Sequence, residues 1–368
     1  MKSIPHYFSH ILIVILIVAC SDENSDKQEN SIDFGFTLMR TNYKIQQGEL
    51  FSFNCKGISL LDRIELHLNG EKYKSWNQPK SNLFQVKTDG LKLGTYSIEI
   101  RGFNNNELIS SDGRLLMINS PDSVKNIDYE FVSSHPHNPN HFTQGYEFYK
   151  DRLYESTGNP SNQGTTKVAE IDSKTGLSLR EVKQPNPIFG EGISILGSKV
   201  FQISWRDQKC FVYDLNTFQQ DTVFVYSGEG WGLCNDKSHI IMSNGTHELV
   251  YRDPLTFKVV KRISVHSDVA PVTNLNELEF YNGRIYANLW RNELRHQEDS
   301  RMNFSKILEI NPENGKVTGY IDLRDLIERS IKPGVPNGIA FRTSSNTLWI
   351  TGKNWNEAYE IKLDTKNR

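Results

Sequence analysis

The sequence predicts an all-β protein in which a five-bladed β-propeller follows a small immunoglobulin-like β-sandwich. Five strand-like runs in the second part of the chain end in polar turns of similar composition, which predicts five repeats of one structural unit. In the first part, short runs alternate between apolar and polar residues, as expected for strands with one buried face. The chain has 368 residues, of which 11% are aromatic, so it is long enough for two domains with separate cores.

Residues 31–120 carry the signals of the small sandwich. Residues 63–68 and 96–100 alternate with a period of two, and Asn69-Gly70 is a two-residue hairpin signal. Several such strands over about ninety residues fit an immunoglobulin-like sandwich. Cys55 has no evident partner for the disulfide that often joins the two sheets, so the name describes architecture alone. Nothing in this part suggests catalysis, and we expect a spacer or adhesion module.

The repeated turns of the second part share one pattern, an apolar residue followed by an aspartate or asparagine and then by threonine or glycine. The acidic or amide positions are Asp172, Asp214, Asp253, Asn311 and Asp364. The first three are about 40 residues apart, the length of a four-stranded propeller blade. The later spacings are longer, so we expect inserted loops at residues 291–302 and at the helix-like residues 323–331. Residues 127–132 are expected to close the ring by adding a strand to the last blade, and the propeller domain is expected to span residues 125–368.

The N-terminus predicts export. Lys2 is followed by an apolar run at residues 11–19 that is too short to span a bilayer, so residues 1–19 are interpreted as a signal peptide. The sequence ending at Cys20 resembles the bacterial lipobox, which predicts a lipidated cysteine followed by a polar tether over residues 20–30. The alternative is an ordinary cleaved signal. We expect a protein of the bacterial cell envelope, attached to a membrane by a lipid anchor on the periplasmic or outer-surface face.

Charge and cysteine content exclude other classes of function. The net charge of −2 provides no basic surface for nucleic acid, so no nucleic-acid partner is expected. Cys55, Cys210 and Cys234 follow no metal-binding spacing, and we interpret them as small buried apolar residues, although Cys210 and Cys234 could pair on neighbouring strands.

Short motifs of glycine, aromatic and polar residues recur along the second part. In chain order they are His135-Pro136-His137-Asn138-Pro139, Phe142-Thr143-Gln144-Gly145, Tyr154-Glu155-Ser156-Thr157-Gly158, Phe189-Gly190-Glu191-Gly192, Trp205, Gly230-Trp231-Gly232-Leu233, Leu275-Asn276-Glu277-Leu278-Glu279, Asn288-Leu289-Trp290, Asn337-Gly338-Ile339-Ala340 and Thr351-Gly352-Lys353-Asn354-Trp355. Each is weak alone. Their order, from about Asp128 to the C-terminus, resembles that of the plant and bacterial glutaminyl cyclases, also called glutamine cyclotransferases. The resemblance implies a five-bladed propeller and an enzyme that converts N-terminal glutamine to pyroglutamate with release of ammonia.

Glu191 is the candidate catalytic residue, acting as a proton shuttle. Two glycines flank this carboxyl group and allow a substrate to approach closely, and Phe189 supplies an apolar wall that would raise its pKa. A shuttle is needed because the attacking α-amine must be neutral, whereas the departing ammonia needs a proton. The alternative is a solvated glutamate in a Gly-x-Gly turn.

The resemblance implies substrate-binding roles for eight further residues, which are Phe142, Gln144, Phe189, Trp205, Trp231, Asn276, Trp290 and Lys353. The three tryptophans would form an aromatic box that could hold an ammonium group by cation–π attraction. Their alternative role is packing between blades. The two amides and the lysine would donate hydrogen bonds to the developing oxyanion. Their alternatives are turn-bracing amides and a surface charge.

Two features limit which roles of the family's site residues can be assigned to residues of this chain. Glu277 and Glu279 would point to one face of a strand and Asn276 to the other, so either the amide or the glutamate pair faces the pocket, and the family favours Asn276. The family's Ser-Asp-Gly is Ser243-Asn244-Gly245 in this chain, which removes a carboxylate.

The resemblance implies no required cofactor. Some relatives hold a structural calcium ion, but the chain has no aspartate-rich loop of calcium-site spacing, so calcium is optional. His135, His137 and His141 cluster in sequence, yet the interleaved prolines indicate an extended entry to a strand, and we expect no metal site there.

The expected substrates are peptides or proteins with N-terminal glutamine. The alternative is a non-catalytic propeller that binds a peptide or an envelope component, because propellers host many functions. The joint presence of Glu191, Trp205, Trp231, Asn276 and Lys353 favours the enzyme. A lactonase-like hydrolase would need a ring of metal ligands that the motifs do not supply.

Overall fold

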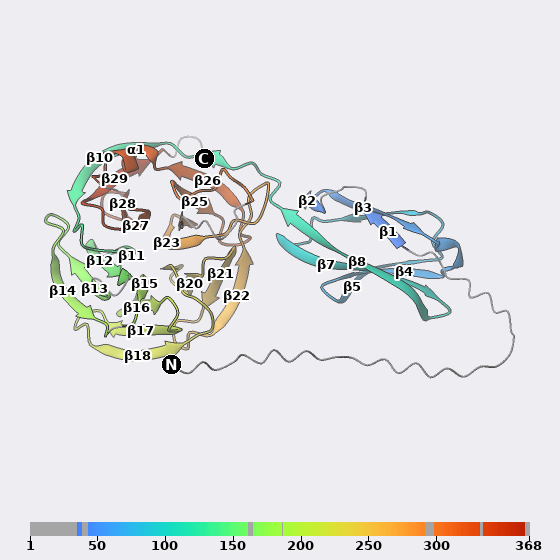
Figure 1. Ribbon diagram of the computed structural model, residues 1–368, viewed down its shortest axis with the longest axis horizontal. Coiled ribbons are helices and arrows are strands. Elements are labelled where there is room, and N and C mark those ends of the chain that lie inside the picture. The colour runs from blue at the N-terminus through green and yellow to red at the C-terminus, as the bar shows by residue number, and fades with distance from the viewer. Residues whose placement is uncertain are drawn as a thin grey trace, which may run out of the picture.

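The computed structural model describes residues 43–160, 165–185, 187–290, 298–331 and 334–364, together with the backbone of residues 35–38. Figure 1 shows an elongated two-sheet body beside a ring of five sheets. The proposed signal peptide, the lipidated Cys20 and the tether lie outside the described residues. Among the helices of the described part, none is long and apolar enough to cross a membrane.

The N-terminal body consists of two sheets around one core. The smaller sheet has the order β1 (Gly35–Leu38), β3 (Leu50–Lys56), β6 (Leu83–Lys87), and the larger has the order β2 (Lys44–Gln46), β8 (Glu107–Asn119), β7 (Gly94–Asn104), β4 (Arg63–Leu68), β5 (Glu71–Asn77). A short 3-10 turn, η1 (Ile58–Leu60), precedes β4. Phe53, Ile64 and Ile98 are fully buried between the sheets. The sandwich architecture follows from this core, and its immunoglobulin-like assignment stays a prediction.

The ring is a five-bladed propeller, as the sequence predicted. Each blade is a four-stranded antiparallel sheet whose first-named strand is the innermost. The first two blades are β11 (Thr143–Tyr149), β12 (Arg152–Thr157), β13 (Lys167–Ile171), β14 (Ser178–Lys183), and β15 (Gly190–Leu196), β16 (Lys199–Ser204), β17 (Lys209–Asp214), β18 (Gln220–Val225). The third and fourth are β19 (Leu233–Asn235), β20 (Ile240–Ser243), β21 (Glu248–Arg252), β22 (Val259–Ser264), and β23 (Leu275–Tyr281), β24 (Arg284–Leu289), β25 (Lys306–Ile310), β26 (Val317–Asp322). The fifth is β27 (Pro336–Arg342), β28 (Thr347–Gly352), β29 (Glu357–Leu363) and β10 (Tyr129–Pro136).

Ring closure joins the two ends of the propeller sequence. Strand β10 pairs antiparallel with β29, from Tyr129 opposite Leu363 to Pro136 opposite Glu357, so the strand expected to close the ring does so. A short strand, β9 (Lys125–Asn126), runs parallel to β26 and leads in from the sandwich. The predicted helical insertion is α1 (Arg324–Arg329), and residues 291–297 of the other predicted insertion lie outside the described residues.

The five repeated turns occupy one equivalent position. Each aspartate or asparagine stands at the end of the third strand of its blade, where the chain turns toward the fourth. The Asp214 carboxylate accepts hydrogen bonds from the backbone N–H groups of Asn216 and Thr217, each at 3.0 Å, which closes the turn. In the last blade Asp364 follows β29, and the fourth strand is supplied by β10 from the other end of the sequence. The repeats therefore marked the blades because each blade needs the same turn at the same place.

The three described cysteines are buried and unpaired, which confirms their interpretation as small apolar residues. Cys210 and Cys234 belong to different core clusters of the propeller, and no disulfide joins them.

Candidate active site

The candidate site is built from irregularities at the start of the inner strands. In four blades the pairing register between the inner strand and its neighbour shifts near the first residues of the inner strand. These shifts fall at Gln144, Glu191, Asn276 and Asn337, because an extra residue in one strand forms a β-bulge. A bulge changes the direction in which a side chain points, so each of these blades presents one polar side chain at the same end of its inner strand.

Glycine allows these inner strands to lie against one another. A Cβ atom added to Gly232 would lie 2.0 Å from the carbonyl oxygen of Asn276, and one added to Gly192 would lie 2.4 Å from the backbone nitrogen of Leu233. Real side chains do not fit such gaps. Gly192 and Gly232, which follow Glu191 and Trp231, are therefore needed for the close packing of backbone between neighbouring blades at the site.

Glu191 and Lys353 are the two oppositely charged groups of this buried site. Their relative exposures are 6% and 4%. Burial raises the pKa of Glu191 well above its ordinary value, although the charge of Lys353 opposes this shift and that of Glu229 adds to it. Burial also lowers the pKa of Lys353 to about 8, against the influence of Glu191. Each group is thus held where its charged form is costly, which favours proton transfer at near-neutral pH.

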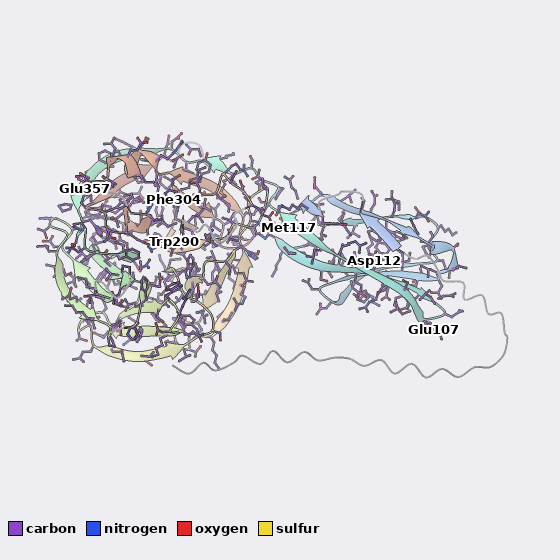
Figure 2. All side chains as sticks on the ribbon, viewed as in Figure 1. Glu107, Asp112, Met117, Trp290, Phe304 and Glu357 are labelled. Atoms are coloured by element: carbon purple, nitrogen blue, oxygen red, sulfur yellow. The ribbon has the colours of Figure 1, made fainter. Side chains whose placement is uncertain are left out.

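Lys353 joins the polar and aromatic sides of the site. Its Nζ donates a hydrogen bond of 2.5 Å to Oε1 of Gln144. The same ammonium lies 4.6 Å from the ring centroid of Phe142 and 4.4 Å from that of Trp290. These cation–π contacts partly offset the loss of hydration. Figure 2 places Trp290 toward the middle of the ring, as expected for a residue of the channel mouth.

The aromatic wall continues from Phe142 around the site. The rings of Phe142 and Phe189 meet edge to face at 6.2 Å, and those of Phe189 and Trp205 meet at 5.7 Å. The Arg206 guanidinium lies 3.8 Å from the Trp205 ring centroid.

Trp231 is connected to the aromatic wall by the ion pair of Glu229 and Arg206. Its indole N–H donates to Oε2 of Glu229 at 3.0 Å, and Oε1 of the same carboxylate pairs with Nε of Arg206 at 3.3 Å. Because Arg206 also covers Trp205, two of the predicted tryptophans are coupled through Glu229.

The backbone carbonyl group of Asn276 is connected to the third blade by hydrogen bonds. Its carbonyl oxygen accepts a hydrogen bond of 2.6 Å from Ser243 Oγ, which itself accepts the backbone N–H of Gly232. The side-chain Oδ1 of Asn276 is buried and has no hydrogen-bond partner among the described residues. The neighbouring Asn244 uses its Oδ1 to accept from the backbone N–H and hydroxyl of Thr246, so the altered Ser-Asn-Gly motif closes a turn that an aspartate oxygen could close equally.

Glu277 and Glu279 bind the backbone of other blades. Glu277 accepts the N–H of Tyr146 on β11, and Glu279 accepts that of Phe341 on β27. Burial raises the pKa of Glu279 to about 8 and that of Glu277 well above its ordinary value. The bulge between Leu275 and Leu278 interrupts the strict alternation expected of this strand, but the two glutamates are still engaged separately from Asn276.

The histidine cluster resolves into two separate groups. His135, within β10, hydrogen bonds to Glu360 at 2.9 Å and stacks on Trp349. His137 and His141 instead meet at Glu155, with nitrogen-to-oxygen distances of 3.1 and 2.6 Å. The sequence predicted an extended entry to a strand at these histidines and assigned no role to Glu155, which approaches from the second strand of the first blade.

The cluster of His137, His141 and Glu155 could offer three metal ligands, whose atoms lie within 4.8 Å of one another. In the structure both imidazoles hydrogen bond to the Glu155 carboxylate. Thr143 Oγ1 adds a donor to Glu155 at 2.7 Å, and His137 Nδ1 lies 2.7 Å from the carbonyl oxygen of Trp355. The pKa of Glu155 is held well below its ordinary range by the two imidazoles despite its burial, and that of His137 is raised by Glu155 in the same way. The cluster therefore ties the turn that carries Lys353 to the start of β11.

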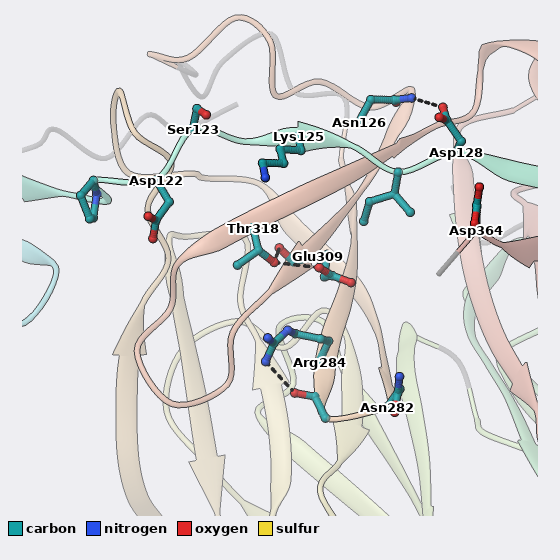
Figure 3. Close-up of a pocket in the computed structure, with 13 residues that line it drawn as sticks. Asp122, Ser123, Lys125, Asn126, Asp128, Asn282, Arg284, Glu309, Thr318 and Asp364 are labelled. Atoms are coloured by element: carbon teal, nitrogen blue, oxygen red, sulfur yellow. Dashed lines mark hydrogen bonds between the residues drawn. The ribbon is translucent and has the colours of Figure 1, made fainter. Parts of the chain in front are cut away.

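A separate groove lies away from this site. It has a volume of about 860 Å³ and runs between the linker that carries β9 and the fourth blade (Figure 3). Lys125, Asp128, Arg284 and Glu309 are among its lining residues, which include no aromatic side chain and none of the nine predicted site residues. The groove is open to solvent and lined by charged groups of both signs, whereas the polar side chains at the four bulges are buried away from water.

Fold and site together define an enzyme built on a propeller, in which the buried carboxyl group of Glu191 and the buried amine of Lys353 lie beside an aromatic wall. The sequence model of the glutamine cyclotransferase family matches residues 110–363, and the chain belongs to that family. It is 35% identical over 243 residues to a glutaminyl-peptide cyclotransferase of Arabidopsis thaliana, covering 64% of this chain and 71% of that protein. The crystal structure of glutaminyl cyclase from Myxococcus xanthus superposes with a TM-score of 0.58 at 30% identity, covering 66% of this chain and 99% of that one.

Proposed function

We propose that this protein converts the N-terminal glutamine of peptides or proteins to pyroglutamate and releases ammonia. The observation that carries the proposal is the buried pair of Glu191 and Lys353, placed beside the Gln144 amide and within an aromatic wall. The family membership and the activity in the names of the two relatives support the same reaction.

Proton transfer is assigned to Glu191. The α-amine of the substrate attacks the side-chain carbonyl carbon, a new C–N bond closes the five-membered ring, and the original C–N bond breaks. Glu191 accepts a proton from the attacking amine and gives it to the departing nitrogen, which leaves as ammonia. Its raised pKa suits both steps, because a carboxyl group with an ordinary pKa would be a weak base toward the amine.

Lys353, Gln144 and Asn276 are assigned to the amide of the substrate. The ammonium of Lys353 stabilises the negative charge that develops on the carbonyl oxygen, with Gln144 as second donor, and one such donor can be worth about 2.7–4 kcal/mol in the transition state. Asn276 Oδ1, buried without a partner among the described residues, is the acceptor for an N–H of the substrate. The tryptophans exclude water and enclose the apolar part of the glutamine side chain.

Mass spectrometry of a Gln-initiated peptide tests the reaction. The parent protein is expected to remove 17 Da, the mass of ammonia, whereas a Glu191→Gln variant should not, and Glu313→Gln on an exposed turn serves as the control. Binding of the peptide without turnover by folded parent protein would refute the cyclase and leave a binding propeller.

No cofactor is assigned to the reaction, so turnover is expected to survive chelation. A structural calcium ion fits one place in the propeller, since Glu277 Oε2 is buried with no partner among the described residues and carboxylate oxygens are the ligands that calcium prefers. Glu277 would supply one ligand to it, whereas both oxygens of Glu279 already accept backbone N–H groups, those of Phe280 and Phe341. A rise in melting temperature on adding calcium after chelation, lost in Glu277→Gln, would support this assignment, and an unchanged melting temperature would contradict it.

We also propose that the protein is exported and anchored by lipid on Cys20. The support is the apolar run at residues 11–19 and the lipobox-like sequence that ends at Cys20. Incorporation of radiolabelled palmitate into the parent but not into Cys20→Ala tests the anchor, and equal incorporation would refute it.

A further inference from the structure

Asn337 is a buried amide beside the site whose hydrogen bonds determine the orientation of Gln144. It lies at the register shift of β27, the inner strand of the fifth blade, and it is fully buried. Its Nδ2 donates to the carbonyl oxygen of Thr143 at 3.0 Å and to Oε1 of Gln144 at 2.9 Å. Both acceptors belong to β11, which is 193 residues or more away in sequence.

The orientation of the Gln144 amide follows from its two donors. Lys353 Nζ can only donate, so the Gln144 atom that it contacts must be the oxygen. Asn337 Nδ2 contacts the same oxygen, and its second contact is a backbone carbonyl, so this atom must be the Asn337 nitrogen. With Oε1 held by two donors, Gln144 is left with its Nε2 for the substrate.

We propose that Asn337 is a positioning residue of the cyclotransferase reaction, which keeps the N–H₂ group of Gln144 directed at the substrate carbonyl oxygen. The inference rests on the proposed function. Without Asn337, the oxygen of Gln144 keeps only Lys353 as donor, and the amide is free to rotate and present its oxygen to the oxyanion. A lone pair at that point would repel the charge that develops in the transition state.

The structure also shows how Asn337 itself is held. The next residue, Gly338, has a φ of +153°, and its N–H donates to Oδ1 of Asn288 on β24 at 3.0 Å. A Cβ atom on Gly338 would lie 2.7 Å from a methyl carbon of Thr351. Packing against the fourth blade thus fixes the bulge from which Asn337 reaches the first blade.

Kinetics of Asn337→Ala and Asn337→Asp test this role with a Gln-initiated peptide. We expect kcat to fall about 10- to 100-fold in both variants, with KM changing less, because misplacement of a catalytic group by a small distance can cost this much. The aspartate keeps the shape of the side chain but replaces the donor with an acceptor. A matched control is Asn235→Ala, which removes another inner-strand amide that donates to Ser194 Oγ and to the Ile195 carbonyl oxygen on the neighbouring blade.

A double-mutant cycle separates positioning from general stability. If Asn337 acts through Gln144, Asn337→Ala should cost little further kcat in a Gln144→Ala background. An equal loss of kcat in both backgrounds, or kcat unchanged in folded Asn337→Ala, would overturn the inference. A parent protein with no turnover would instead refute the proposed function itself, so the two failures are distinguishable.

Discussion

Replacing Lys353 with methionine should change how the stability of the protein depends on pH. The ammonium is 4% exposed, and its burial lowers the pKa from 10.5 to about 8. That gap corresponds to about 3 kcal/mol by which the folded protein favours the neutral amine over the ammonium. Methionine has a similar length and no charge, so it removes the titration and retains much of the apolar contact.

The unfolding free energy of the parent rises with pH wherever the unfolded chain binds more protons than the folded chain. Below pH 8 both folded and unfolded chains carry the Lys353 proton, and the folded state bears the full cost. Between pH 8 and about 10.4 the unfolded chain binds more protons, so the stability of the parent rises with pH. From pH 7 to pH 9.5 the parent is expected to gain about 2 kcal/mol relative to Lys353→Met.

Urea unfolding followed by tryptophan fluorescence measures this difference at both pH values. Both proteins should be compared in the Glu191→Gln background, because removal of the lysine charge alone also alters the titration of Glu191. In that background the Lys353 ammonium is no longer stabilised by the Glu191 carboxylate, so its pKa should be lower still. The change in unfolding free energy between pH 7 and pH 9.5 should therefore be at least as large as in the presence of Glu191. A stability difference that stays constant from pH 7 to pH 9.5 would refute the argument that burial depresses the pKa of Lys353.

Three further substitutions test other parts of the site. Glu155→Gln should destabilise the propeller by about 3 kcal/mol in urea unfolding, because it removes the buried charge to which two imidazoles donate, and an unchanged midpoint would contradict this. Gly232→Ala should lower the melting temperature sharply, since the added methyl would lie 2.0 Å from a carbonyl oxygen, whereas Gly90→Ala meets nothing within 4 Å and should not. Glu229→Gln should lower the pKa of Glu191, so the acid limb of kcat/KM should move to lower pH, and a limb that stays in place would show that the two carboxylates do not interact.

Several features of the fold could be predicted because they depend on local sequence. Each blade requires the same turn after its third strand, so Asp214 and its four counterparts reveal the number of blades. Glu191 could be selected because Gly190 and Gly192 leave no side chain beside it, and the structure shows backbone of the next blade packed against Gly192.

Other features of the site depend on residues that are far apart in sequence. Asn337 belongs to a motif visible in the sequence, but its role appears only when β27 lies against β11 and the amide reaches Gln144. Glu229 stands directly before Gly-Trp-Gly, yet only the folded chain shows that it pairs with Arg206 and holds Trp231. The three histidines are close in sequence, but only the folded chain shows that His135 pairs with Glu360, whereas His137 and His141 hydrogen bond to Glu155 of the first blade.

The sequence by itself determined the all-β class, the five repeats and the residue types available for chemistry, because alternation, turns and glycines act over a few residues. Only the tertiary structure decided which of these residues meet and in which ionisation state. Lys353 and Gln144 are 209 residues apart, and they touch because β10 closes the ring and brings the last blade beside the first. The pKa values of Glu191 and Lys353 shift because the folded ring buries both groups away from water, and this burial exists only once blades from distant parts of the sequence pack together.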